Sequence, residues 1–301
     1  MYKIDVTKLK NKLEELNKLL ETYQENYLNM YYQIEISDEE EYWVDPHARN
    51  FFDDKYFEKS KMEESYDELK EISNLLNSIV NRYSNLGGVV EFDLSYRSNI
   101  LSKFNIYKNK LNRILSSYND LDYSFASYDI VNAISNQIES VRSQLYLSDM
   151  LRENVIDIMD NINEYEHEIA RMIKNISINK IQSVDIEKYC TTENNEHVEK
   201  SVINIEEINN VSKKMNLYSD LENSNFIGII NNFKNVISLY NTKNSILLEN
   251  IKDSIRNKFD NINDCNVNNI EVFKRNIDKY KTIDEEVTSD AANIGAWFYV
   301  R

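Results

Sequence analysis

Glycine and proline are nearly missing from this chain. Only four glycines and one proline occur in 301 residues, well below the usage of an average globular protein. Because these two residues end helices and form tight turns, their scarcity favours long, uninterrupted helices. The sequence therefore predicts an all-α protein, built as elongated antiparallel helical hairpins or as a coiled-coil-like helical bundle.

Apolar and charged contents narrow the class further. The chain is 42% hydrophobic and 29% charged, and its 35 basic and 51 acidic residues give a net charge of -16. That charge repels phosphate backbones and anionic lipid surfaces, so nucleic acid is excluded as an expected partner. No apolar run reaches the length of a membrane-spanning helix, and no membrane insertion is expected.

An apolar stripe marks the first segment. Its residues recur at spacings of three and four, the period of one helix face: Val6, Leu9, Leu13, Leu16, Leu20, Tyr23, Tyr27, Met30 and Ile34. A second run of this kind extends from Phe52 to Val80 and ends before Gly87 and Gly88. Two helices of similar length with a short connection pack antiparallel, so residues 1–88 are predicted to form a helical hairpin.

The connection is predicted between Trp43 and Phe51. Pro46, the only proline, suits a first helical turn because it has no backbone N–H to donate. Asp45 before it is well placed as an N-cap. Trp43 and Phe51 are expected to flank the turn, and a binding role requires Trp43 to be partly exposed at the tip. The alternative is a capped turn whose aromatic rings only pack.

The pattern Trp43-x-Asp45-x-x-Ala48-x-x-Phe51 between two long helices resembles the Trp-x-Gly family of small helical-hairpin proteins, which type VII secretion systems export. Asp45 stands where the family usually has glycine, and the resemblance covers only the first hairpin. It implies a Gram-positive source, a secretion ATPase as partner, and a helical protein partner or a second copy along the hairpin. The implied location is the medium or the cell surface after synthesis in the cytoplasm.

The beginning of the chain fits a route without a signal peptide. Residues Met1 to Val6 lack the basic start and the apolar stretch of a secretory signal. Classical export is therefore not expected.

Substrates of this family commonly carry a Tyr-x-x-x-Asp/Glu signal in a C-terminal helix. Tyr280 and Asp284 match it, and four residues place both side chains on one helix face. The same spacing occurs at Tyr31/Glu35, Tyr118/Asp122, Tyr189/Glu193 and Tyr218/Glu222. Location alone favours Tyr280 and Asp284, and the alternative is that Tyr280 packs in a helix seam.

Two further regions follow the hairpin. Residues 89–180 begin with an extended stretch, Val89 to Phe92, and continue as long helices with a polar break at about 119 to 128. Residues 181–301 form a C-terminal helical region carrying the Tyr-x-x-x-Asp match.

Turns are also predicted inside the C-terminal region. A polar turn is expected from Asn261 to Asn266. The triplet Phe226-Ile227-Gly228 is an aromatic residue two positions before glycine, and one hypothesis makes it a decayed second copy of the elbow.

Catalytic and metal-binding patterns are weak. Glu164 and His167 form one Glu-x-x-His element, which di-iron bundles use in pairs, and the alternative of a surface histidine is favoured. Cys190 and Cys265 lack zinc-ligand spacing, and either two free thiols or one bridge is compatible with them. Phosphate-binding loops and nucleophile elbows do not occur. We therefore expect no catalysis, cofactor or metal.

Two hypotheses of different classes result. The first is a non-enzymatic, exported helical protein that acts by protein–protein binding through Trp43, Asp45, Ala48, Phe51, Tyr280 and Asp284. The second is a cytoplasmic coiled-coil scaffold or adaptor with no export role, and a ferritin-like metal bundle is a weaker third.

Overall fold

Six long helices make up most of the described chain. The computed structural model describes residues 2–122, 124, 126–179, 186–190 and 202–299, and side chains apart from those of 202 and 290–299. The helices are α1 (Val6–Glu39), α2 (Pro46–Ser84), α3 (Arg97–Asn119), α4 (Tyr128–Asn175), α5 (Ile205–Leu239) and α6 (Ser245–Tyr299). The predicted all-α class is confirmed.

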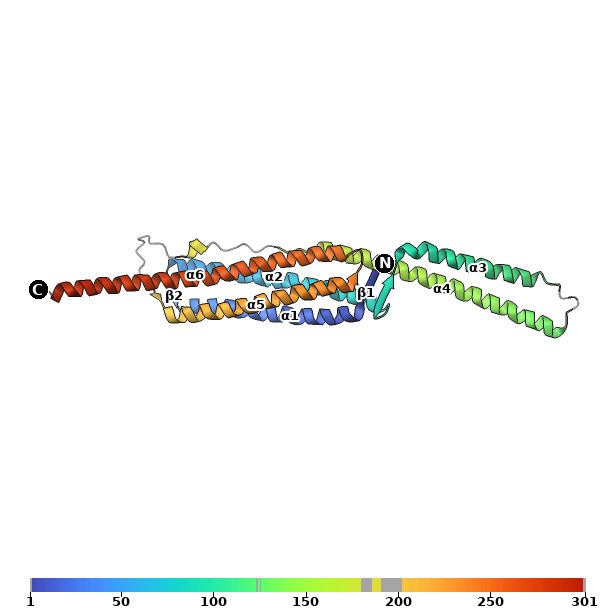
Figure 1. Cartoon of the computed structure of the whole chain (residues 1–301), viewed down its shortest axis with the longest axis horizontal. Helices are drawn as coiled ribbons and strands as arrows, with labels where there is room; N and C mark the ends of the chain where they lie inside the picture. Colours follow the sequence, from blue (N-terminus) through green and yellow to red (C-terminus); the bar gives the residue numbers. More distant parts are fainter. Residues whose placement is uncertain (1, 123, 125, 180–185, 191–201, 300–301) are drawn as a thin grey trace.

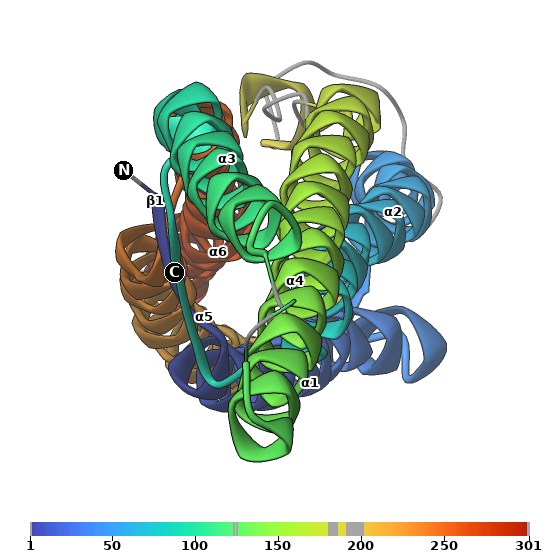
Figure 2. The same cartoon turned by 90° about the vertical axis from the view of Figure 1, so that its right-hand side faces the viewer.

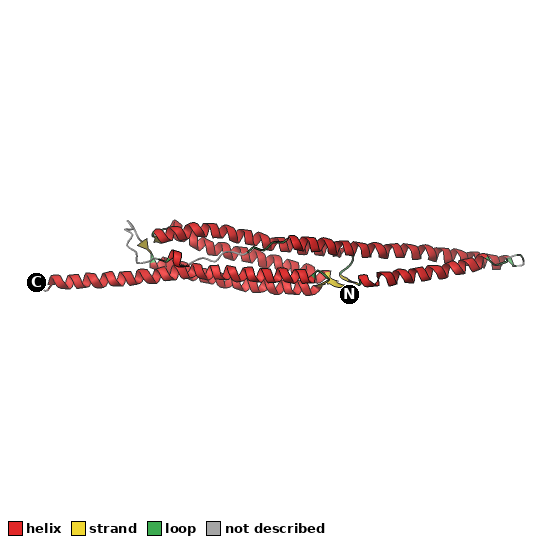
Figure 3. Ribbon diagram, turned by 90° about the horizontal axis from the view of Figure 1, so that it is seen from above, coloured by secondary structure: helices red, strands yellow, loops and turns green. Residues whose placement is uncertain are grey.

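Short strands and 3-10 turns join the helices. The strands are β1 (Tyr2–Asp5), β2 (Trp43–Val44), β3 (Val89–Phe92), β4 (Val202–Ile203) and β5 (Tyr240–Asn241), and the turns are η1 (Leu94–Tyr96) and η2 (Ile186–Tyr189). Figure 3 shows how little of the molecule is strand.

Helices α1, α2, α5 and α6 form a four-helix bundle (Figure 1). Helix α1 packs against both α2 and α5, and α5 packs against α6. Helices α3 and α4 form a second hairpin that extends from one end of the bundle, as the end-on view of Figure 2 shows. At the opposite end, the last part of α6 runs past its neighbours. None of the helices in the described residues has the length and apolarity needed to cross a membrane.

The α1 stripe forms the centre of the bundle core. All nine stripe residues named above are buried, none more than 7% exposed. Helix α2 packs against α1, and the Tyr31 hydroxyl of α1 donates to Glu58 Oε1 of α2 at 2.6 Å. The seam continues onto α5 and α6, since the Tyr23 ring lies 5.3 Å from Phe226 and 6.3 Å from Phe259. The first hairpin therefore finds its partner pair within the same chain.

Two small sheets close the ends of the bundle. Strand β1 pairs antiparallel with β3 and with β5, so Ile4 lies opposite both Val90 and Tyr240. At the other end β2 pairs with β4, which places Trp43 opposite Ile203. The predicted extended stretch at Val89–Phe92 is confirmed as β3. Strand β1 was not anticipated, because its four residues carry too short a pattern to separate from the helix that follows.

The predicted turn from Asn261 to Asn266 is wrong, because α6 runs through it without a break. The asparagines serve contacts between helices instead. The side-chain amide of Asn223 on α5 donates to Asn263 Oδ1 at 2.7 Å, and that of Asn266 donates to Glu222. A polar run that looks like a turn in the sequence is a row of interhelical hydrogen bonds.

The predicted second elbow is also wrong. Phe226, Ile227 and Gly228 lie inside α5. A Cβ on Gly228 would stand 3.1 Å from Leu19 Cδ2 of α1, so this glycine permits close approach of two helices. The actual chain reversal follows at Tyr240, where Thr242 and Ser245 hydrogen-bond the backbone between α5 and α6.

Two predictions fall partly or wholly outside the described residues. The predicted boundary between residues 180 and 181 lies wholly outside the described residues. The polar break at 119 to 128 is confirmed where it is described, between α3 and α4.

Candidate functional site

In the elbow between α1 and α2, Asp45 is the N-cap of α2, as the sequence predicts. Glu41 adopts a left-handed backbone, with φ at 53°, and the Tyr42 N–H bonds the Ser37 carbonyl at 3.0 Å. The chain then enters β2, and Asp45 Oδ1 accepts the Ala48 N–H at 2.6 Å. Pro46 opens α2. Asp45 therefore supplies the N-cap that this helix end needs.

The second oxygen of Asp45 connects the elbow to a distant helix. Asp45 Oδ2 accepts the indole N–H of Trp43 at 2.9 Å and the hydroxyl of Tyr280 at 2.9 Å. Asp45 is only 8% exposed, and hydrogen bonds to a carboxylate are stronger than neutral ones. One carboxylate thus holds β2, α2 and α6 together, and we call Trp43, Asp45 and Tyr280 the elbow node.

The node explains the departure from glycine at position 45. The backbone there is extended, with φ at -161° and ψ at 176°, a conformation that any residue adopts. Glycine would fit this backbone, but it could neither cap α2 nor accept the bonds from Trp43 and Tyr280. Aspartate at this position therefore has a structural reason.

Trp43 is not exposed at the hairpin tip, so the condition for a binding role of this side chain is not met. Its side chain is 2% exposed. Its ring lies 5.8 Å from Phe51, 5.9 Å from Phe52 and 6.0 Å from Phe273. The tryptophan is covered because α6 brings Phe273 over the elbow and β4 pairs with β2.

Ala48 and Phe51 belong to the same closed cluster. Ala48 is 2% exposed and Phe51 is fully buried. The Phe51 ring also contacts Tyr189 of η2 at 5.5 Å. The elbow residues therefore pack against one another, and their aromatic faces present no open surface.

Tyr280 and Asp284 have different surroundings. Tyr280 is partly buried and bonds Asp45, whereas Asp284 and every other residue from 281 to 289 are exposed. Helix α6 continues beyond this point past the bundle (Figure 1). The structure thus brings Tyr280 to the elbow, and leaves Asp284 one turn further on, at the start of the segment we call the α6 projection (residues 281–299).

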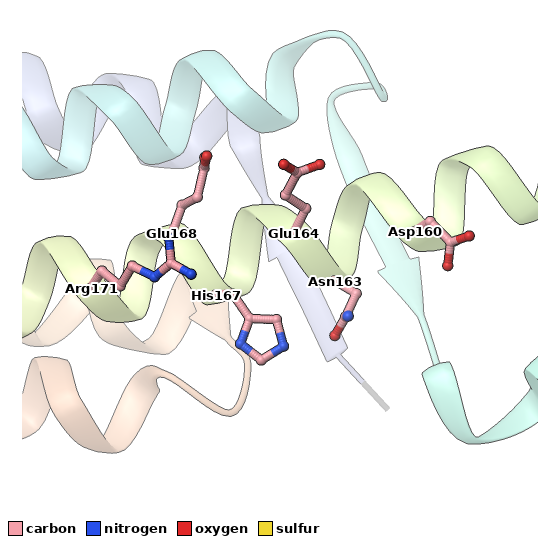
Figure 4. Close-up of a pocket in the computed structure, with 6 residues that line it drawn as sticks. All are labelled: Asp160, Asn163, Glu164, His167, Glu168 and Arg171. Carbon is pink, nitrogen blue, oxygen red and sulfur yellow. The ribbon is translucent and has the colours of Figure 1, made fainter.

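Glu164 and His167 lie on the surface of α4 with Asp160, Asn163, Glu168 and Arg171 around a shallow depression (Figure 4). Glu164 and Glu168 point to one side of the helix and His167 to the other. Glu168 pairs with Arg82 of α2. No group of three or more His, Cys, Asp or Glu side chains in the described residues has a metal-binding arrangement.

Glu166, between those residues, is a buried centre that sequence reasoning missed. It is fully buried and accepts the hydroxyls of Tyr83 at 2.6 Å and Tyr240 at 2.5 Å, with the Asn244 amide at 3.0 Å. Burial raises the pKa values of both tyrosines, so the hydroxyls stay protonated as donors. The carboxylate joins α2, α4 and the α5–α6 connection, where the second hairpin leaves the bundle.

A second buried carboxylate sits in the middle of the bundle. Glu58 accepts from Tyr31 and from the Asn269 amide at 2.8 Å, and it pairs with Lys55, which is 2% exposed. Burial lowers the pKa of the Lys55 ammonium, and the charge of Glu58 opposes that shift. All four side chains are buried, and Tyr31 and Lys55 line one small pocket with Ile34, Glu35, Phe52 and Tyr56.

Glu222 of α5 has only one hydrogen-bond partner. The Asn266 amide donates to its Oε2, while Glu222 Oε1 and Asn266 Oδ1 have none in the described part of the chain. Burial raises the pKa of Glu222 to about 8. In the sequence, Glu222 stands out only because Tyr218 and Glu222 match the Tyr-x-x-x-Asp/Glu spacing. That spacing does not indicate burial.

Cys190 and Cys265 are thiols that form no disulfide with each other. Cys265 lies fully buried in α6, and burial raises the pKa of Cys190. Thiols held in the neutral form react slowly as nucleophiles.

Comparison with models of known protein families, with curated proteins and with solved structures finds no match to this chain. The elbow node, the buried carboxylates and the exposed helix faces are therefore the observations on which function is argued.

Proposed function

We propose that this protein is non-enzymatic and acts by protein–protein binding. In this proposal a secretion ATPase recognises the α6 projection, and the protein leaves the cell by the type VII route, as the Trp-x-Gly proteins that its elbow resembles do. One observation carries the proposal: the projection begins at Tyr280, which the elbow node fixes to Asp45 at 2.9 Å. The two sequence features that carry the resemblance therefore meet in one place.

The projection has the properties of a recognition helix. Asp284, Glu285 and Glu286 are consecutive acids on an exposed helix, and Ile283 and Val287 are 41% and 61% exposed. A helix with apolar residues one turn apart is suited to lie in a groove of a partner. The hydrogen bond from Tyr280 fixes the direction in which this helix leaves the bundle.

Export is tested by measuring the protein in culture medium from bacteria with and without the secretion ATPase. We expect extracellular protein only when the ATPase is present, in the medium or at the cell surface. Equal amounts in both strains would overturn the export proposal.

The signal is tested with Asp284→Ala, because Asp284 is exposed and its loss leaves the fold intact. Glu285→Ala is the matched control, since it removes an acid from the adjacent, equally exposed position. We expect export to fall at least tenfold for Asp284→Ala and to stay unchanged for the control. Equal export of the two variants would show that Tyr280 and Asp284 are not the signal.

A second candidate is the cytoplasmic coiled-coil scaffold or adaptor. Exposed apolar side chains on the α3–α4 hairpin support it, among them Tyr146 at 70% and Leu151 at 52%. Protein retained in the cells of both strains, together with co-purification of a helical partner, would favour this function.

A further inference from the structure

Helix α3 has two seams, and only one of them is covered. Phe104, Leu111 and Leu115 face α4, with Leu111 fully packed at 4% exposure. A second stripe lies on the outer face and repeats every seven residues, as a helix-docking seam does. It consists of Lys103, Ile106, Tyr107, Lys110, Arg113 and Ile114, and we call it the outer seam of α3.

The apolar members of the outer seam are open to solvent. Ile106 is 53% exposed, Tyr107 46% and Ile114 44%. Helical spacing puts all three within one sector, interleaved with the cations. Tyr107 lies at one edge of the stripe, where its hydroxyl donates to Gln144 Oε1 of α4 at 3.4 Å. The hairpin leaves the Ile106 and Ile114 side chains open to solvent.

The charge of α3 is opposite to that of the rest of the chain. It carries Arg97, Lys103, Lys108, Lys110 and Arg113 and no acid, in a protein of net charge -16. Arg97 pairs with Asp160 and Lys108 with Asp149, both on α4. Within the described residues the three cations of the outer seam form no ion pair.

The α6 projection carries the complementary pattern. Ile283 and Val287 share one helix face, and Asp284 and Glu286 flank them. Acids therefore border the apolar pair of the projection, whereas cations lie among the apolar residues of the outer seam. Glu285 lies on the opposite side of the helix. At 1.5 Å per residue the 19 residues of the projection span about 28 Å, close to the roughly 35 Å of the 23-residue α3.

These two surfaces lie at opposite ends of the long molecule (Figure 1). The projection cannot reach α3 of its own chain, because both are held on rigid helices that point apart. We propose that the α6 projection of one copy lies along the outer seam of α3 in the next copy, head to tail. Such a contact is heterologous and does not close on itself, so it generates open chains of molecules.

Self-association of this kind is weak and depends on salt. Exposed ion pairs contribute about 0.2–1 kcal/mol each, and salt screens them. The apolar residues supply the remainder, so we expect association at high micromolar concentration that decreases when salt is added. The inference goes beyond export, because it concerns the purified protein alone.

Sedimentation velocity on the purified full chain tests the proposal. Lys103→Glu with Lys110→Glu reverses the outer seam, and Asp284→Lys with Glu286→Lys reverses the acids that flank Ile283 and Val287 on the projection. We expect concentration-dependent growth for the wild type, monomer for either variant alone, and restored association in an equimolar mixture of the two. Lys10→Glu with Lys18→Glu, on exposed α1 positions, is the matched control and should associate as the wild type does.

Three outcomes would overturn the proposal. The wild type could remain monomeric at all concentrations, the charge-reversed variants could associate normally, or their mixture could fail to associate. Vesicles containing anionic lipid test a membrane surface as the alternative partner of the outer seam. A wild type that stays monomeric and binds these vesicles through Lys103 and Lys110 would assign the outer seam to a membrane and overturn the proposal.

Discussion

Glu222 gives the sharpest test of the packing. It is fully buried in α5, and burial raises its pKa to about 8 from an ordinary value of 4.5. The folded protein therefore keeps the proton at neutral pH, whereas the unfolded chain releases it. Replacement by glutamine, Glu222→Gln, preserves the shape and keeps an acceptor for the Asn266 amide while removing the ionisation.

The magnitude follows from linkage between proton binding and folding. Between pH 4.5 and 8 the folded state binds more protons than the unfolded state, so the free energy of unfolding falls as pH rises. Each pH unit costs about 1.4 kcal/mol, which amounts to about 3 kcal/mol at pH 7. Above pH 8 both states are ionised and the loss is complete.

Urea denaturation followed by circular dichroism, at pH 5 and at pH 7.5, measures the effect. We expect Glu222→Gln to raise the free energy of unfolding by about 4 kcal/mol at pH 7.5. At pH 5 we expect little change. Glu25→Gln on exposed α1 makes the same charge change and should alter neither value. Equal pH dependence of the wild type and Glu222→Gln, or a less stable variant at pH 7.5, would refute the reasoning.

Two further predictions concern stability. Lys258→Met removes the 2% exposed ammonium that pairs with Glu68 and leaves that carboxylate with Asn179 as its donor and no cation, so we expect a loss of about 3 kcal/mol in urea denaturation. A double variant with Glu68→Leu should recover most of this loss, and a double variant no more stable than Lys258→Met alone would contradict the pairing. Gly87→Ala forces a side chain onto a backbone with φ at 132° and should cost about 1–2 kcal/mol; an unchanged urea midpoint would argue against this strain.

Periodicity was sufficient for α1 because it is a local property. The spacing of its apolar residues gave the buried face correctly from Val6 to Ile34, since any helix with such a stripe must cover it. The Asp45 cap was predictable for the same reason, as it depends on residues within one turn.

The surroundings of Trp43 were not predictable in this way. Its burial depends on Phe273, and Asp45 receives Tyr280, both from α6. Nothing in the local pattern around residue 43 specifies which later helix covers it. The partial exposure of Trp43 that a binding role requires is therefore not met.

Buried carboxylates were missed because the chain contains many acids and most of them are exposed. Glu166 differs from its neighbours only in the partners that Tyr83, Tyr240 and Asn244 bring from other elements. In the same way, the asparagines from 261 to 266 looked like a turn because polar runs usually are turns. They lie in a continuous helix because two of them form hydrogen bonds with α5.

The pairing of α1 with α5 has a consequence for the order of folding. Strand β1 is completed by β5, and Asn232 on α5 bonds Glu15 on α1 at 3.2 Å, across a sequence separation of 217 residues. Contacts this distant along the chain slow folding, whereas the α3–α4 hairpin contains only local ones. During synthesis the outer hairpin can therefore form early, while the part of the apolar face of α1 that α5 covers stays open until the last third of the chain has emerged. A chaperone or export factor that binds nascent helices would meet this protein in that interval.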